Sequence, residues 1–236
     1  MTGRVALYYA PEPGSELDRF GASWLGRDAV TGRSIDAPVL PGITGSMRRD
    51  ITATARKYGF HATLKPPFAL ATSRVGFDEA VAEFARNMAP FEAPPLTVGV
   101  LDGFVALLPS APSPELRALA DGCVTSFRKH AARPGDAELA RRRDAGLTLR
   151  QEQNLRWWGY PYVLEDYRFH MTLTNRLPDP GHVCRSLAAL FEPLAACPLA
   201  VNAICVFEQT DRDAPFLMTA RYPLSGAAES HGFKHA

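Results

Sequence analysis

The chain has 236 residues, of which 46% are hydrophobic and 22% are charged, and its formal net charge is +1. This is the composition of an ordinary globular protein. Proteins that work on duplex DNA or on anionic membranes usually carry a larger basic excess, so we expect neither partner, although net charge does not exclude a local basic patch. No apolar run approaches the roughly 18–20 residues that cross a bilayer, and the first residues are too few and too aromatic for a signal peptide. We therefore expect a cytoplasmic protein.

The spacing of apolar residues predicts four strands and two helices in the first half of the chain. Ser15 is a suitable N-cap for the first helix. Asp102-Gly103 is a strong signal for a two-residue hairpin. Residues 26–47 show no periodicity and are predicted to be irregular. The strands are expected at 5–10, 58–64 (stopped by Pro66-Pro67), 96–101 and 104–108, and the helices at about 16–25 and 77–88.

The second half of the chain predicts three helices and three strands. Ser113-Pro114 opens a helix with proline in its favoured first position. Thr148 and Gln151 have capping-box spacing, so a short helix should run to Trp158. A further helix begins after Asp179-Pro180, and strands are expected at 167–174, 199–207 and 216–222.

Two conspicuous features have simpler explanations than a functional site. The run Arg141-Arg142-Arg143 could bind phosphate, but we favour a solvated helix face. The cysteines lack metal-type spacing and have apolar neighbours, which indicates small buried residues in a reducing compartment: Cys123, Cys184, Cys197 and Cys205.

One seven-residue segment occurs twice. Tyr58-Gly59-Phe60-His61-Ala62-Thr63-Leu64 recurs as Tyr167-Arg168-Phe169-His170-Met171-Thr172-Leu173, with five of seven positions identical. An internal repeat of this kind bears on the architecture of the whole chain. We therefore expect two equivalent halves, each built on one copy.

Alternation within each copy predicts a strand with two different faces. In the first copy Phe60 and Leu64 should face a core, and the opposite face carries His61, Thr63 and Lys65. The same parity groups a second set, which is Arg168, His170, Thr172 and Thr174. The pKa of histidine lies near neutrality, so two histidines in matched strands indicate paired acid–base chemistry.

The duplicated His-x-Thr-Leu pattern resembles the two-histidine (2H) phosphoesterase superfamily, which includes RNA-ligase-like cyclic phosphodiesterases. One branch, found with phosphonate-utilisation genes, is similar to nearly the whole chain, to about Leu224. Its longer segments correspond to Gly59–Phe68, and to Trp158–Val163 followed by Phe169–Thr174. The resemblance implies chemistry at a cyclic phosphodiester without metal or other cofactor, with catalytic roles for His61, Thr63, His170 and Thr172.

The order helix, motif strand, helix, strand, strand occurs twice. It predicts an α+β protein with two pseudo-symmetric lobes, each an antiparallel sheet with helices on its outer face, and a central cleft between the lobes. We expect one bilobal domain over residues 1–224, from repeats of about 1–110 and 111–224 with an insertion at about 132–166. Residues 225–236 are predicted to form a flexible tail.

The expected substrate is a small phosphorylated molecule. It would be a 2′,3′-cyclic phosphate on a nucleotide or RNA end, or a ribose 1,2-cyclic phosphate, which only the gene neighbourhood of the similar branch suggests. One imidazole would take a proton from water and the other would protonate the leaving oxygen, and the sequence leaves their assignment open. Lys65 and Arg168 suit phosphate oxygens, Thr174 is a further candidate, and Tyr8 is either a stacking platform or a core residue.

Two other classes of function compete with this interpretation. Zinc or manganese held by both histidines would want a third protein ligand, and Glu165 and Asp166 have the wrong parity or context. A non-catalytic module that binds a nucleotide or RNA end would not need the four motif residues kept together. We favour the metal-independent phosphoesterase and keep the binding module as the alternative.

Overall fold

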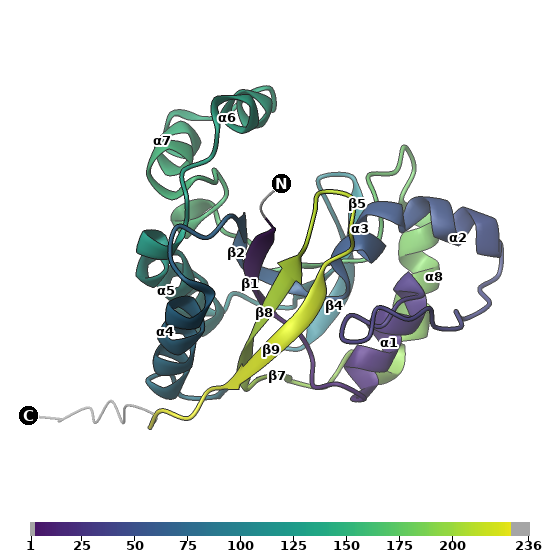
Figure 1. The fold of residues 1–236 in the computed structure, drawn as a ribbon. Coiled ribbons are helices and arrows are strands. Elements are labelled where there is room, and N and C mark those ends of the chain that lie inside the picture. The colour runs from purple at the N-terminus through teal and green to yellow at the C-terminus, as the bar shows by residue number, and fades with distance from the viewer. Residues whose placement is uncertain (1–2, 228–236) are drawn as a thin grey trace, which may run out of the picture.

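The computed structural model describes residues 3–227 and is built on one seven-stranded antiparallel sheet (Figure 1). The strand order is β4-β5-β6-β2-β1-β8-β9, and a small separate sheet pairs β3 with β7. The predicted α+β class with antiparallel pairing is confirmed. The strands are β1 (Arg4–Tyr9), β2 (Ala62–Phe68), β3 (Phe91–Ala93), β4 (Leu96–Leu101), β5 (Phe104–Pro109), β6 (Met171–Thr172), β7 (Leu199–Val201), β8 (Ala203–Gln209) and β9 (Leu217–Pro223).

Helices cover the two ends of the sheet in separate groups (Figure 1). α4 (Arg74–Arg86) and α5 (Pro114–Ser126) contact the half that contains β2, β8 and β9, whereas α8 (Gly181–Phe191) contacts β4. α1 (Glu16–Leu25) packs on α8, where the rings of Phe20 and Phe191 meet edge to face with centroids 4.9 Å apart. The other helices are α2 (Gly45–Ile51), α3 (Ala53–Tyr58), α6 (Asp136–Arg143) and α7 (Leu149–Trp158), with 3-10 turns at 128–130, 164–166 and 192–194.

The two halves of the sheet do not coincide with the two predicted repeats. β1 pairs with β2 on one side and with β8 on the other, and β8 pairs with β9. β6, from the second motif copy, pairs with β5 from the first half of the chain. The halves join where β2 lies beside β6, through the single pair Ala62 and Met171. The two motif copies therefore meet at this seam.

Predictions that depend on neighbouring residues are confirmed. The Ser15 hydroxyl caps α1, and Thr148 and Gln151 form a reciprocal capping box at α7. Asp102 and Gly103 connect β4 to β5 with φ angles of 48° and 86°, the left-handed values that a type I′ hairpin turn requires. The geometry of these caps and of this turn is set by residues close together in the chain.

Several predictions of element bounds and burial are wrong. The segment expected to be irregular over 26–47 ends at Gly45, where α2 begins, and α2 buries none of its side chains, so it lacks the apolar stripe by which a helix is recognised. The first motif strand begins at Ala62, because Tyr58 belongs to α3, and the second contains only Met171 and Thr172. β2 continues through Pro66 and Pro67, because its register with β1 shifts there and the prolines occupy an irregular stretch of the ladder. Cys197 is exposed rather than buried. The segment expected as one strand at 199–207 is divided between β7 and β8, which belong to different sheets.

Both faces of the sheet are packed with apolar side chains. The main core includes Phe60, Leu64 and Met171 together with the inner sides of α1, α4, α5 and α8. A smaller cluster lies on the other face and consists of Ala6, Tyr8, Ala10, Cys205, Phe207 and Phe216. No helix within the described residues has the length and apolar character needed to cross a membrane.

The end of the described chain is attached to α4. The backbone N–H groups of Ser225 and Gly226 donate to the carbonyl oxygens of Ala85 and Met88, at 3.3 and 3.0 Å. Residues 228–236, most of the tail predicted to be flexible, lie outside the described residues.

Close contact between α1 and the first motif gives a test of the packing. A Cβ atom on Gly21 would overlap the ring of Phe60, the residue before His61. We expect Gly21→Ala to lower the free energy of unfolding by about 1–3 kcal/mol, because overpacking a dense core forces side chains from their preferred positions. Urea denaturation measures the change.

The control is Gly135→Ala, because Gly135 has an ordinary φ of −70° and no neighbouring atom within 4 Å of the added carbon. It should keep the free energy of unfolding within about 0.5 kcal/mol. Equal stability of both variants would contradict the packing described for α1.

Candidate active site

The two motif copies form one surface at the seam of the sheet. Extending the antiparallel register of Ala62 and Met171 by one residue places His61 opposite Thr172, and His170 opposite Thr63. Ala62 and Met171 are fully buried on the core side, whereas all four motif residues are half-buried on the other side. The backbone therefore places these four residues on one face of the sheet, as the alternation in the sequence predicts.

Each imidazole is held by a carbonyl group two residues earlier in the chain. The Nδ1 of His61 lies 2.9 Å from the carbonyl oxygen of Gly59, and the Nδ1 of His170 lies 2.8 Å from that of Arg168. A carbonyl can only accept, so Nδ1 carries the proton in both rings. In the neutral state, Nε2 is then the basic nitrogen of each histidine.

The ring of Tyr8 packs against the imidazole of His61. Its ring stacks on that of His61 with centroids 3.8 Å apart and planes inclined by 24°. Tyr8 is fully buried and also contacts Phe207 and Phe216. Tyr8 is thus both a core residue and a stacking platform, but the group that it stacks on is the histidine.

The surroundings of the histidines disfavour their charged forms to different extents. The pKa of His61 is lowered to about 4, chiefly by burial and also by the charges of His170 and Arg27, whereas the hydrogen bond to the Gly59 carbonyl acts to raise it. Burial also lowers the pKa of His170, but the Arg168 carbonyl and the Asp102 carboxylate both act to raise it. His61 has no such carboxylate among the causes of its shift, so His170 is protonated more readily.

The threonines differ in what their hydroxyl groups can do. The Thr63 hydroxyl lies 3.3 Å from Nε2 of His61, to which it can donate, and Thr172 lines the same cleft. Thr174, a predicted substrate contact, is among the lining residues of the cleft, but its hydroxyl is buried and accepts a hydrogen bond from the Val105 N–H at 2.9 Å. Thr174 therefore fastens β5 to the end of the second motif.

Lys65 is a correction to the sequence prediction. It does not line the histidine cleft, because the irregularity between β1 and β2 leaves both Leu64 and Lys65 buried and ends the strict alternation. Its Nζ donates to the Val124 carbonyl in the last turn of α5 at 3.1 Å and lies over the ring of Phe68. A cation suits that position, where helix carbonyls lack partners.

Arg168 is a partial correction. Its side chain is exposed, approaches Asp102 at 3.9 Å, and lines an adjoining cavity that shares Thr63 and His170 with the histidine cleft. What it supplies to the site is its backbone carbonyl, the partner of His170. Asp102, in the β4–β5 hairpin, belongs to the same group of charges and was not singled out from the sequence.

The cleft above the histidines has a volume of about 750 Å³ and a basic, aromatic lining. Four arginines line it, and no aspartate or glutamate of the described residues does so. Sequence reasoning missed the following lining residues as a group: Arg4, Tyr58, Phe104, Tyr160, Asn175 and Arg176. Arg141 is exposed and α6 buries no side chain, as expected for a solvated helix face, but Arg141 and Arg142 also line the cleft, the position that a phosphate-binding role would require.

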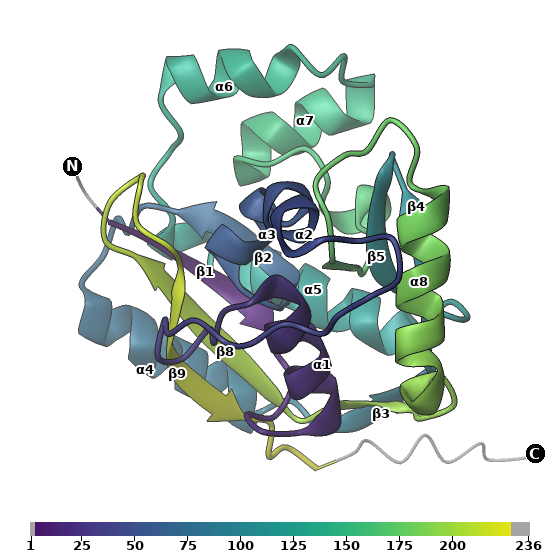
Figure 2. The ribbon, with the colours of Figure 1, turned by 90° about the vertical axis from the view of Figure 1, so that its right-hand side faces the viewer.

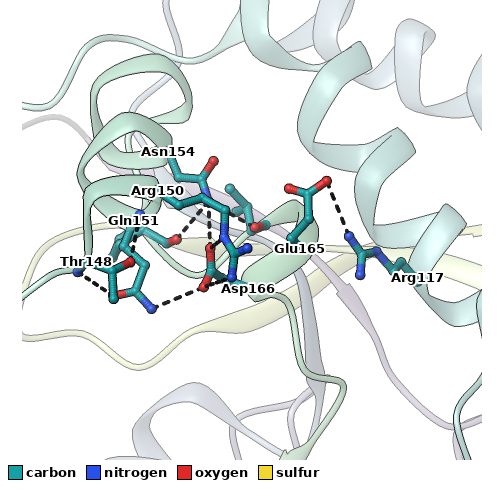
Figure 3. A network of polar contacts seen from close by, with 9 residues as sticks. Arg117, Thr148, Arg150, Gln151, Asn154, Glu165 and Asp166 are labelled. Carbon is teal, nitrogen blue, oxygen red and sulfur yellow. Dashed lines mark hydrogen bonds and ion pairs between the residues drawn. The ribbon is translucent and has the colours of Figure 1, made fainter.

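The insertion contains α6 and α7, which lie together at the top of the ribbon in Figure 2, and α6 contributes Arg141 and Arg142 to the lining of the cleft. Asp166, just before the second motif, accepts hydrogen bonds from Arg150, Gln151 and Asn154 of α7 at 2.8–3.2 Å. Figure 3 shows these side chains converging on Asp166, with Glu165 turned away toward Arg117 on α5. The Asp166 carboxylate is thus occupied by hydrogen bonds from α7.

Within the described part of the chain, no three His, Cys, Asp or Glu side chains cluster as metal ligands would.

A model of the family described as "Protein of unknown function (DUF1045)" matches residues 63–217, so the chain belongs to this family. The match begins two residues after His61 and includes the whole second motif.

Two curated relatives are both named "Ribose 1,5-bisphosphate phosphokinase PhnN". The one from Janthinobacterium sp. (strain Marseille) is 38% identical over 244 residues, which cover 99% of this chain and 53% of the relative. The one from Laribacter hongkongensis (strain HLHK9) is 36% identical over 208 residues, which cover 84% and 48%. The chain thus spans about half the length of these relatives.

Solved structures with some likeness include E. coli LigT complexed with NADP+, which is 13% identical, with 95% of this chain and 99% of that chain covered and a TM-score of 0.45. Another is TT0787 of Thermus thermophilus, which is 15% identical, with 72% and 80% covered and a TM-score of 0.40. Scores this low describe a loose similarity and carry no argument about the present chain.

The buried position of Lys65 gives a test in the pH dependence of stability. Burial lowers the pKa of Lys65 to about 8, with Cys123 acting weakly in the opposite direction. The unfolded chain therefore holds this proton more tightly, and the cost of burying the charge disappears as the pH rises from about 8 toward about 10.4, the ordinary lysine value.

We expect the free energy of unfolding of the wild type, minus that of Lys65→Met, to rise by about 2–3 kcal/mol across that pH range. Urea unfolding at pH 7, 8, 9 and 10 measures it, and Lys129→Met is the control, because Lys129 is exposed. A difference that does not change with pH would mean that Lys65 is solvated.

Proposed function

We propose that this chain is a metal-independent phosphoesterase of the two-histidine type, which opens a cyclic phosphodiester by water attack. The observation that carries the proposal is the matched pair of imidazoles. Both have Nδ1 fixed by a backbone carbonyl, and both line one cleft with a threonine hydroxyl opposite. A lining with four arginines and no carboxylate suits an anion and offers a divalent cation few of the oxygen ligands it prefers.

The reaction needs one imidazole as a base and one as an acid. The Nε2 of the base takes a proton from water while the water oxygen bonds to phosphorus. The opposite P–O bond of the cyclic ester breaks, and the acid gives its Nε2 proton to the departing oxygen. One water is consumed, and the product is a phosphomonoester beside a free hydroxyl group. Solvent then restores the original protonation states.

We infer the two roles from the electrostatic asymmetry of the site. The lowered pKa of His61 keeps its ring neutral near pH 7, as a base requires. The Asp102 carboxylate favours a proton on His170, as an acid requires. A bound phosphate would raise both pKa values through its negative charge. His61 is therefore the base and His170 the acid for hydrolysis, and the reverse reaction exchanges the roles.

The favoured substrate is a ribose 1,2-cyclic phosphate, with a nucleoside 2′,3′-cyclic phosphate as the second candidate. Opening the 1,2-cyclic ester at its O2 leaves a ribose 1-phosphate, the group contained in the compound for which the curated relatives are named. We propose no kinase activity for this chain. The relatives are about twice as long, and the chain has no Gly-x-x-x-x-Gly-Lys-Ser/Thr segment of the kind that cradles nucleotide phosphates.

Replacement of either histidine tests the proposal. We expect His61→Ala and His170→Ala each to lower turnover by at least about 100-fold, because each removes one proton transfer. Turnover is measured by phosphate-product formation, with EDTA present, on ribose 1,2-cyclic phosphates and nucleoside 2′,3′-cyclic phosphates. His182→Ala is the control, since His182 lies on α8 and does not line the cleft.

Near-wild-type turnover by both motif variants would refute the acid–base mechanism. If the wild type binds these esters but turns none of them over, the chain is instead a binding module for nucleotides or sugar phosphates.

The assignment of acid and base has its own test in Asp102→Asn. Asparagine tolerates the left-handed backbone at this turn, so the hairpin should persist. Loss of the carboxylate lowers the pKa of His170, so the protonated acid disappears at lower pH. The alkaline limb of the kcat/KM profile should move to lower pH, while the acid limb, which reports His61, stays in place. A shift of the acid limb alone would reverse the assignment.

A further inference from the structure

The cleft holds more positive charge than one cyclic phosphate monoanion requires. Its four arginines come from three places: Arg4 on β1, Arg141 and Arg142 on α6, and Arg176 beyond β6. The whole chain has a net charge of only +1. Four arginines in one cleft therefore indicate a ligand with more than one anionic group. The carboxylates of Asp102, Glu165 and Asp166 line an adjoining cavity that shares His170 with the cleft.

The two arginines of α6 are placed differently from the third member of their run. Arg142 is mostly buried, stands 4.7 Å from the centre of the Tyr160 ring and is held by Glu138 at 2.6 Å. Arg141 is exposed in the cleft, and no ion pair or side-chain hydrogen bond involves it in the described part of the chain. Arg143 points away and binds Glu152 on α7 at 2.9 Å.

The insertion fixes the position of these arginines relative to the histidines. Arg143 ties α6 to α7, and α7 is bound through Arg150 and Asn154 to Asp166. Asp166 lies four residues before His170. Figure 1 and Figure 2 both place α6 and α7 together at the top of the molecule. Arg141 and Arg142 therefore lie on a helix that is bound through α7 to Asp166, close to the second motif.

We propose that Arg141 and Arg142 form a subsite for a second, terminal phosphate on the same small substrate whose cyclic phosphate lies at the histidines. A terminal phosphomonoester is a dianion at neutral pH, and paired guanidinium groups match both its charge and its oxygen geometry. The pair lines the same open cleft as His61 and His170. The subsite deepens the proposed function and depends on it for the identity of the reacting group.

A kinetic comparison tests the subsite through substrate preference. Ribose 1,2-cyclic phosphate and adenosine 2′,3′-cyclic phosphate are each compared with the same compound carrying a phosphate on the 5-position. Wild type should show kcat/KM higher by about 10–100-fold for the phosphorylated member of at least one pair, the range that hydrogen bonds to charged groups supply.

Arg141→Gln and Arg142→Gln should each lower kcat/KM more for the phosphorylated member than for the unphosphorylated one, so that most of this preference is lost. The control is Arg156→Gln, on the same insertion, because Arg156 is 70% exposed and outside the cleft. An absent preference in wild type, or equal losses on both members of each pair, would overturn the subsite while leaving the phosphoesterase standing.

A binding measurement separates the subsite from catalysis. Titration calorimetry with ribose 5-phosphate, compared with ribose, probes the terminal phosphate without any cyclic ester. We expect tight binding only with the phosphate, a Kd raised about tenfold in Arg141→Gln and in Arg142→Gln, and no change in Arg156→Gln. Unchanged affinity in both cleft variants overturns the subsite, even if the enzyme hydrolyses cyclic esters. The expected pattern would support it even if no cyclic ester is turned over.

Discussion

The site depends on one antiparallel residue pair, Ala62 with Met171, at which the two halves of the sheet meet. These two side chains are fully buried on the core side. Side chains alternate along a strand, so burial of this pair forces the residues before and after it to the opposite face. A shift of one residue in this pairing would turn both imidazoles into the core, where their polar nitrogens would lack partners. The packing of two apolar side chains thus fixes the geometry of the polar groups.

The histidines are oriented by groups that do not take part in chemistry. Two backbone carbonyls hold the Nδ1 atoms and set the tautomer, and the Tyr8 ring limits the rotation of the His61 ring. These contacts are also why the site is asymmetric despite its matched motifs. One imidazole is stacked on a fully buried ring, whereas the other lies near the hairpin carboxylate of Asp102. Burial and charge together therefore separate two histidines that have the same sequence context.

The insertion forms one side of the cleft that lies above the motif residues of β2 and β6. Without α6 and α7, the seam of the sheet would offer the motif residues and the adjoining loops. With them, Arg141, Arg142 and Tyr160 enclose the space above the imidazoles. The interactions that hold the insertion are largely exposed ion pairs, which contribute little individually, so its position rests on the shared network at Asp166 and Asn154. We regard the cleft wall as the element most able to distinguish one phosphate ester from another.

The sequence by itself determined what depends on local geometry or on strict alternation. It predicted the helix caps, the Asp102-Gly103 turn, the antiparallel α+β class and the shared face of the four motif residues, because each follows from neighbours in the chain. Tertiary structure decided the rest. An irregularity opposite β1 buried Lys65, a hydrogen bond to Val105 occupied Thr174, and Arg168 turned toward Asp102. The arginines of α6 line the cleft from a helix that is bound indirectly, since Arg143 of α6 binds Glu152 of α7 and Arg150 of α7 binds Asp166. Pairings between distant segments leave no periodic signal in a single sequence, so only the folded chain could supply them.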